Sequence, residues 1–110
     1  MADITLQKVE KAMDYLQSTD ESFAQAKASM TAGKERLKTT FAQCYLDATG
    51  DNVKERESYA LVSKDYRTQL EVYEESILEY EIIRNKRLRA ELLIEVWRSI
   101  NSARSKGVMT

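Results

Sequence analysis

Apolar residues recur every three or four positions through the first half of the chain, as they do on one face of an α-helix. The series is Leu6, Val9, Met13, Leu16, Phe23, Met30, Leu37, Phe41, Cys44 and Ala48. Asp20, Lys27 and Lys34 stand where an uninterrupted coiled coil has apolar side chains. The pattern predicts a helical arm over residues 3–48, formed by one helix or by two that divide near residues 18–20. Of these we favour one helix.

Gly50, Asp51 and Asn52 interrupt the helical pattern. Glycine is common at the left-handed position that ends a helix, and Asp or Asn is common at the N-cap of the next one. We therefore predict a turn over residues 49–52, a second helical arm over 53–105 and a frayed tail over 106–110. Ser63 is a candidate cap for a separate start, so a short helix near the turn belongs to the prediction.

The apolar positions of the second arm change side along its length. From Tyr66 to Tyr80, residues spaced by three and four are aromatic or aliphatic. Beyond residue 80 the same spacing falls on Arg84 and Arg87, and the apolar residues occupy a different side of the helix. Such a shift rotates the buried face partway along a helix. The predicted seam for packing or oligomerisation is Tyr66, Leu70, Tyr73, Ile77, Tyr80, Leu93, Trp97 and Ile100. Stacking of unpaired bases on Trp97 or on the tyrosines is the less favoured interpretation of these side chains.

Composition agrees with long helices and a thin core. The chain has no proline and three glycines in 110 residues, so few residues would break a helix. At a rise of 1.5 Å per residue, residues 3–48 would span ~69 Å and residues 64–105 ~63 Å. Matched lengths predict an all-α fold: one domain over residues 1–110, a long antiparallel helical hairpin resembling a coiled coil. Because two rods bury little apolar surface, we expect a homo-oligomer.

A net charge of −1 conceals two oppositely charged segments. Residues 51–81 hold nine acids and four bases, whereas residues 84–106 hold seven bases and two acids. Lysine and arginine on a helix are suited to phosphates, which predicts a nucleic-acid-binding surface. Its candidate residues are Arg84, Lys86, Arg87, Arg89, Arg98, Arg104 and Lys106. Alternatively, late bases complement the helix dipole, or the two segments pair between subunits or with another protein.

Residues suited to catalysis are scarce. The chain has no histidine, which removes the commonest general base and metal ligand near neutral pH. Cys44 lies on the apolar stripe, where a cysteine is usually a small core residue, and no glycine-rich phosphate loop is present. A metal site made of carboxylates alone is conceivable at Glu71, Glu74, Glu75 and Glu79, but acids at helical spacing more often form a solvated helix face. We therefore predict a protein that is not an enzyme and has no cofactor and no metal site.

The amino-terminal sequence favours a cytoplasmic protein. It has no basic region followed by an apolar run, as a signal peptide would, and no stretch approaches the roughly 18 apolar residues of a membrane span. A single cysteine excludes an intrachain disulfide and agrees with a reducing compartment. We expect no membrane partner.

Two stretches of the second arm resemble a known group of proteins. They are Leu-Glu-Val-Tyr-Glu-Glu-Ser-Ile-Leu-Glu-Tyr-Glu (residues 70–81) and Arg-Ala-Glu-Leu-Leu-Ile-Glu-Val-Trp-Arg-Ser-Ile-Asn-Ser-Ala-Arg (residues 89–104). Residues 53–106 resemble small helical bacteriophage proteins of recombination and replication, most specifically at residues 97–101. In helix plan and size the chain is similar to phage recombination mediators of the UvsY type.

This resemblance implies a ring-like homo-oligomer in the host cytoplasm that binds single-stranded DNA. Such a protein helps to load a recombinase onto strands covered by single-strand-binding protein, so a recombinase is an implied partner. The acidic segment supports a different hypothesis, a protein-binding coiled-coil module such as a phage inhibitor or adaptor of a host complex.

Overall fold

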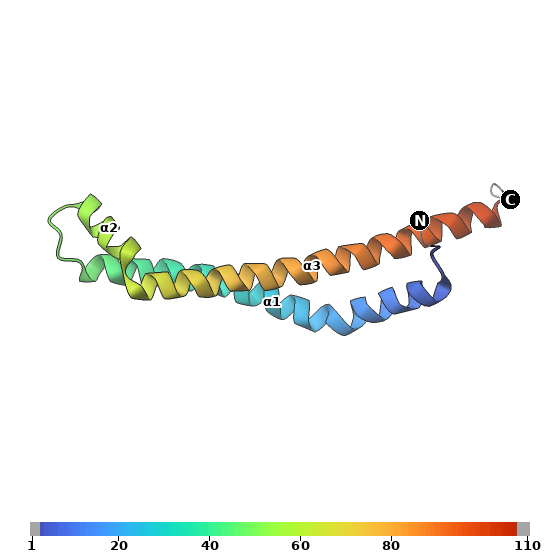
Figure 1. The fold of residues 1–110 in the computed structure, drawn as a ribbon, viewed down its shortest axis with the longest axis horizontal. Coiled ribbons are helices and arrows are strands. Elements are labelled where there is room, and N and C mark those ends of the chain that lie inside the picture. Colours follow the sequence, from blue (N-terminus) through green and yellow to red (C-terminus); the bar gives the residue numbers. More distant parts are fainter. Residues whose placement is uncertain (1–2, 108–110) are drawn as a thin grey trace. The chain divides into compact units, whose positions relative to one another are not determined.

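The computed structural model describes residues 3–107, which form three α-helices and no β-strand. They are α1 (Leu6–Asp47), α2 (Val53–Val62) and α3 (Lys64–Ser105), shown in Figure 1. The prediction of an all-α helical hairpin with two long helices and one short helix is confirmed. Residues 108–110, the end of the predicted tail, lie outside the described residues.

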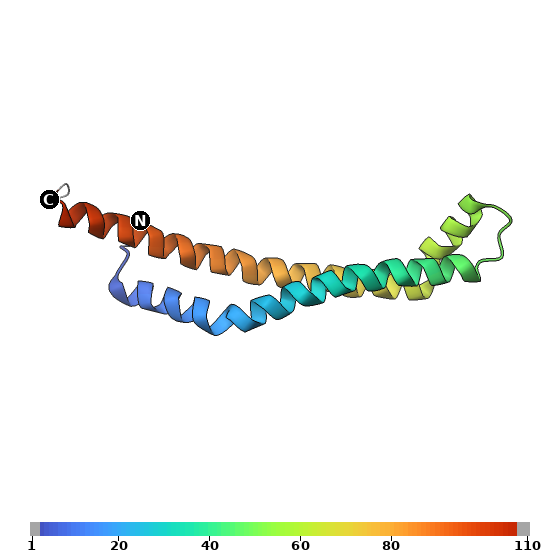
Figure 2. The same ribbon diagram turned by 180° about the vertical axis from the view of Figure 1, so that it is seen from behind.

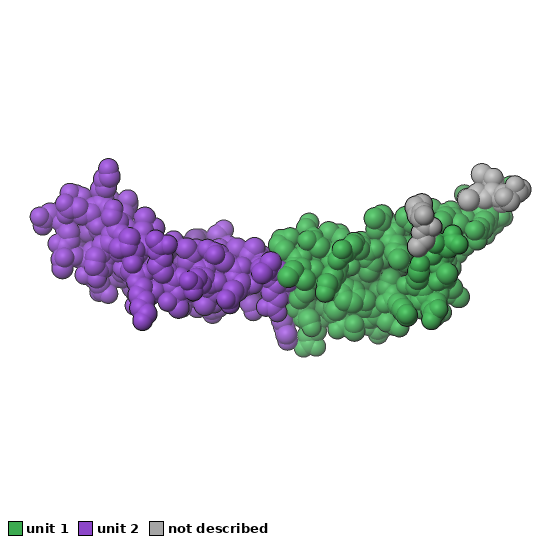
Figure 3. Space-filling model, viewed as in Figure 1, with its two compact units in different colours: residues 1–23, 81–110 green, residues 24–80 purple. Residues whose placement is uncertain are grey.

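The chain forms two compact units, coloured separately in Figure 3. Unit 1 consists of residues 1–23 and 81–110, and unit 2 of residues 24–80. Within each unit a segment of α1 runs antiparallel to a segment of α3, as the opposite views of Figures 1 and 2 show. Unit 2 also holds the turn and α2, whereas unit 1 brings the start of α1 beside the second half of α3.

Helix α1 is continuous, so residues 18–20 do not divide it. Its buried side at these positions uses small residues seven apart, namely half-buried Thr19 and buried Ala26 and Gly33. Asp20, Lys27 and Lys34, which interrupt the apolar stripe in the sequence, are exposed, and the buried position at each interruption is one residue earlier. A hydrophobic pattern gives little weight to threonine, alanine and glycine, and a closely packed helix pair selects for their small size.

The turn begins α2 with a reciprocal cap. The Asn52 side chain accepts a hydrogen bond from the Glu55 N–H at 2.9 Å, and the Glu55 carboxylate accepts one from the Asp51 N–H at 2.9 Å. Gly50 is not in the left-handed region, where Gly107 (φ 72°) is the single example among residues 3–107. The expected left-handed cap at Gly50 was therefore wrong. A Cβ at Gly50 would lie 2.7 Å from the Glu55 Cβ, so glycine is needed here for space.

Ser63 separates α2 from α3 in an extended conformation (φ −63°, ψ 141°). Its backbone N–H donates to the Ala60 carbonyl at 3.2 Å, and its hydroxyl donates to the Tyr59 carbonyl at 2.8 Å. The hydroxyl thus satisfies the last turn of α2 instead of the first N–H groups of α3. The second arm is consequently a short helix followed by a long one, and fully buried Ala60 anchors the short one.

Aromatic contacts hold unit 2 together. The Phe41 ring of α1 meets the Tyr66 ring of α3 edge to face, with centroids 5.7 Å apart. The Arg56 guanidinium of α2 lies 5.9 Å from the Tyr45 ring centroid and donates to the Gly50 carbonyl at 3.0 Å. These two contacts fasten α2 to the end of α1.

Candidate nucleic-acid interface

The eight residues of the predicted seam all lie at half-buried positions of α3. Leu93 and Trp97 pack against the buried cluster of Val9, Ala12, Ala90 and Ile94 in unit 1. Trp97 therefore contributes to packing between α1 and α3. Ile94 is buried although the predicted seam omitted it, because Leu93 beside it is equally apolar and only the partner helix distinguishes the two.

Arg87, which was predicted to bind phosphate, is instead hydrogen-bonded to helix α1. Its Nη1 donates to the Leu16 carbonyl and to the Thr19 hydroxyl, both at 2.8 Å, and its Nη2 donates to the Asp20 carboxylate at 2.8 Å. The guanidinium carbon also lies 5.0 Å from the Phe23 ring centroid. Only 13% of the Arg87 side chain is exposed. Arg87 thus joins α3 to α1, and its assignment to a phosphate-binding surface is corrected.

The other predicted bases of α3 are exposed: Arg84, Lys86, Arg89, Arg98, Arg104 and Lys106. Arg84 lies 3.6 Å from the Glu81 carboxylate, with both side chains about half exposed. A pair of this kind holds its members weakly, so Arg84 can exchange its partner for another anion.

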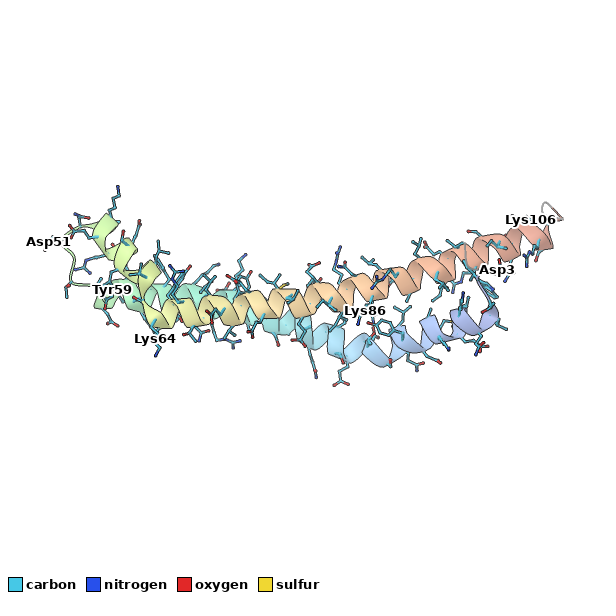
Figure 4. The ribbon with its side chains drawn as sticks, in the orientation of Figure 1. Asp3, Asp51, Tyr59, Lys64, Lys86 and Lys106 are labelled. Atoms are coloured by element: carbon cyan, nitrogen blue, oxygen red, sulfur yellow. The ribbon has the colours of Figure 1, made fainter. Side chains whose placement is uncertain are left out.

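Helix pairing brings two of these bases to two lysines of α1. Lys86 and Arg89 of α3 and Lys8 and Lys11 of α1 line one shallow groove of ≈ 380 Å³ in unit 1. Its apolar lining is Ala12, Tyr15, Ala90 and Leu93. Figure 4 labels Lys86 on α3, and Asp3, whose carbonyl accepts a hydrogen bond from the Lys8 ammonium at 3.0 Å. We call this surface the basic groove.

Lys8, Lys11 and Tyr15 were absent from the sequence-based site. In the sequence they lie within the first arm, and residues 1–50 hold six bases and seven acids, so no local excess of charge marks them. They join the site only because α1 and α3 pair antiparallel in this register. The register itself was the missing signal, since it depends on contacts between residues about 70 positions apart.

The surface that lines the basic groove is mainly apolar, and the four cationic side chains and Tyr15 contribute to it. Four cationic side chains around one groove suit successive phosphates of a strand. Tyr15 is half-buried, so one part of its ring packs in the helix pair while another part remains available at the groove. Stacking of a base on such a ring is tolerant of sequence because every base has a π-face.

A second chemical surface lies on α3 in unit 2. Glu71, Glu74, Glu75 and Glu79 are exposed, and the ion pairs found among residues 3–107 do not include them. Val72 and Leu78 on the same helix are 44% and 61% exposed. Acidic and apolar side chains thus alternate on a solvent-facing surface.

Over residues 3–107, no helix is long and apolar enough to cross a membrane. Comparison with protein-family models, curated proteins and solved structures finds no match to this chain.

Proposed function

We propose that this protein is a non-enzymatic, phage-type accessory protein that binds single-stranded DNA as a homo-oligomer and assists homologous recombination. The basic groove is the observation that carries this proposal, because it gathers four cations from two helices around Tyr15. Phosphate contacts of this type supply most of the affinity of proteins that bind nucleic acid without sequence preference.

A single strand fits the groove better than a duplex does. The groove is short and apolar at its base, with Ala12, Tyr15, Ala90 and Leu93 between the cations. Unpaired bases have apolar faces that can contact this base while the phosphates meet the surrounding lysines and arginine. A duplex hides its base faces and would use only the cations.

Two further features support the recombination role and the oligomer. Residues 53–106 resemble phage recombination mediators, which act on single strands. In addition, thirteen large hydrophobic side chains in the described part of the chain are exposed, while the buried core consists mainly of alanines. Self-association is the usual way for thin helical proteins to cover such apolar surface.

Fluorescence anisotropy of a labelled single-stranded oligonucleotide, measured across salt concentrations, tests DNA binding. We expect affinity to fall steeply as salt rises. Neutralising two groove lysines (Lys11→Gln with Lys86→Gln) should reduce the slope of log K against log salt by about 1.4, because each phosphate contact in a single strand contributes about 0.7. The matched control, Lys54→Gln with Lys64→Gln, removes the same charge from exposed lysines outside the groove and should leave the slope unchanged.

Absence of binding by the wild-type chain at ~50 mM salt would exclude this function, since phosphate contacts are strongest there. Equal effects of the two double variants would show a response to net charge alone. A duplex of the same sequence serves as the competitor that measures preference for single strands.

The exposed acidic surface favours a second candidate, a protein-binding module that inhibits or adapts a host complex. Acidic side chains interspersed with Val72 and Leu78 suit a basic partner surface with apolar contacts. Co-purification of one stoichiometric partner, released by Glu74→Lys with Glu75→Lys and retained by the K11Q/K86Q variant, would support this candidate over DNA binding.

A further inference from the structure

One face of α3 in unit 1 carries exposed apolar side chains, two of which, Leu92 and Val96, line a groove with Asp3 and Ile4 of the same chain. Ile82, Leu92 and Val96 are 46%, 60% and 39% exposed. Leu92 lies two residues from both Ala90 and Ile94, the residues that α3 buries against α1, and therefore about 200° around the helix from them. Asn85 and Arg89 complete the spacing of three and four along this face. We call these five residues the outer stripe of α3.

The outer stripe has the spacing of a coiled-coil seam, with Ile82, Arg89 and Val96 seven apart and Asn85 and Leu92 seven apart. Its central part has the same order in both directions: apolar Ile82, polar Asn85, polar Arg89, apolar Leu92. A pattern symmetric about residue 87 matches itself when two copies of the helix pair antiparallel, as a two-fold interface requires.

Antiparallel pairing about residue 87 places each residue opposite a suitable partner. Ile82 faces Leu92 of the second copy, and Asn85 faces Arg89 of the second copy. The arginine guanidinium can donate one of its five N–H groups to the Asn85 side-chain oxygen, which leaves its other donors for the basic groove or for water. Parallel pairing would instead set Arg89 against Arg89, where two like charges repel.

The same register also covers the remaining apolar side chains on this part of α3. Leu88, which is 46% exposed, lies beside the two-fold axis and meets Leu88 of the second copy. Val96 meets the second copy's Leu78, which is 61% exposed. Every large hydrophobic side chain that α3 exposes between residues 78 and 96 thus acquires a partner.

We infer that the outer stripe binds a second copy of this chain in this antiparallel register and that the pairing joins two basic grooves into one strand-binding surface. Lys86 lines the basic groove and lies beside the two-fold axis, on the side away from Leu88. Two copies therefore place their Lys86 side chains next to each other, with Lys8 and Lys11 of each copy farther from the axis. The joining of the grooves rests on the proposed function, whereas the pairing of the stripes does not.

Pairing and strand binding should reinforce each other. The two Lys86 ammonium groups repel across the axis in the free protein, and a phosphate between them turns this repulsion into attraction. A strand that binds the pair more tightly than the single chain must, by linkage, stabilise the pair to the same degree.

Sedimentation velocity over a range of protein concentrations tests the pairing. Leu92→Glu places a charge in the stripe at a side chain that is already 60% exposed, and should raise the dissociation constant of the pair by at least about tenfold. Val72→Glu is the matched control, because Val72 is 44% exposed on the same helix and lies off the stripe. Ile82→Glu should repeat the effect of Leu92→Glu, and circular dichroism checks that helicity is retained.

A wild-type chain that stays monomeric at ~100 μM, a high concentration for specific pairs, would overturn the inference. Equal effects of Leu92→Glu and Val72→Glu would do so too.

Orientation is tested by exchanging the central polar pair. Asn85→Arg alone sets arginine against Arg89 of the second copy and should weaken pairing. Adding Arg89→Asn restores an arginine opposite an asparagine and should recover it. In a parallel pair the double variant would still hold one arginine–arginine layer and would gain nothing over wild type.

Spin labels give an independent measure of orientation. With Ser102→Cys in a Cys44→Ala background, antiparallel pairing about residue 87 separates the labelled positions by about 45 Å along the helix axis. Parallel pairing would hold them within about 20 Å, since paired helices pack 8–10 Å apart. The short distance would contradict the inferred register.

The oligonucleotide measurement separates failure of the pairing from failure of the proposed function. Pairing without strand binding would leave the interface standing and remove the DNA function and the joined surface. Strand binding that is unchanged in Leu92→Glu would leave the function standing and overturn the joined surface. Weaker strand binding in Leu92→Glu but not in Val72→Glu supports both.

Discussion

Arg87 is a charged residue that stabilises the helix pair instead of presenting its charge to a ligand. It has three hydrogen bonds at 2.8 Å to α1 and a ring beneath its guanidinium, and these contacts leave few donors for a phosphate. A buried guanidinium needs such acceptors, because its transfer from water is costly without them. Arg87 therefore selects the one alignment of α1 and α3 that brings Leu16, Thr19 and Asp20 to it.

Replacing Arg87 by alanine should lower the free energy of unfolding by about 1–3 kcal/mol, since hydrogen bonds and ring packing are lost together. The Asp20 carboxylate is 78% exposed, so its share is small. Arg84→Ala is the control. Arg84 is three residues before Arg87 and belongs to an exposed ion pair with Glu81, so its loss should change the free energy of unfolding by less than about 0.5 kcal/mol. Urea denaturation followed by circular dichroism measures both. Equal losses would contradict the internal role of Arg87.

Among the elements, α2 depends on one crowded position. Gly50 approaches the first turn of α2 so closely that a Cβ would lie 2.7 Å from the Glu55 Cβ. The Asn52 cap and the Arg56 contacts hold this turn in place and limit its ability to move away.

Gly50→Ala should therefore destabilise the protein by about 1–3 kcal/mol through overpacking. Gly107→Ala tests the other property of glycine, because Gly107 has a positive φ and open space around it. Thermal unfolding of the two variants separates the two effects. We expect a clear loss for Gly50→Ala and a smaller loss for Gly107→Ala, because local fraying at the end of α3 can relieve the strain of alanine at a positive φ. Tolerance of alanine at Gly50 would show that the turn shifts easily.

The sequence predicted the positions of the helices better than the residues through which the helices contact each other. Periodicity, scarce glycine and absent proline were enough for two long helices, the turn near residue 50 and a short helix before α3. The seam of α1 at Thr19 and Gly33 was missed because small residues carry little hydrophobic signal. The sequence predicted only the part of the basic groove that α3 provides, because the excess of basic residues on α3 marked Lys86 and Arg89. Lys8 and Lys11 join them only through the alignment of α1 with α3.

For the whole molecule, a thin core limits what one chain can contribute to its own stability. Buried hydrophobics are mostly alanine, with Val9 and Ile94 the largest buried aliphatic side chains among the described residues. Burial of apolar area is the main favourable term in folding, so association should add a substantial share here.

We therefore expect the melting temperature to depend on protein concentration. For a pair that unfolds to two chains of this size, a tenfold rise in concentration should increase the midpoint by about 3 °C. Leu92→Glu should remove this dependence, whereas Val72→Glu should keep it. Scanning calorimetry at several concentrations measures the effect, and a midpoint independent of concentration in wild type would contradict association.

Cys44 offers a direct view of how often unit 2 opens. It is the only cysteine in the chain, and its side chain is 7% exposed on α1. Because the residue is largely covered, a thiol reagent should react faster when the helices separate locally, so a change in labelling rate reports a change in that opening. The labelling rate of Cys44 thus measures helix separation in the native protein. It can be compared in the presence and absence of a bound strand without any engineered label.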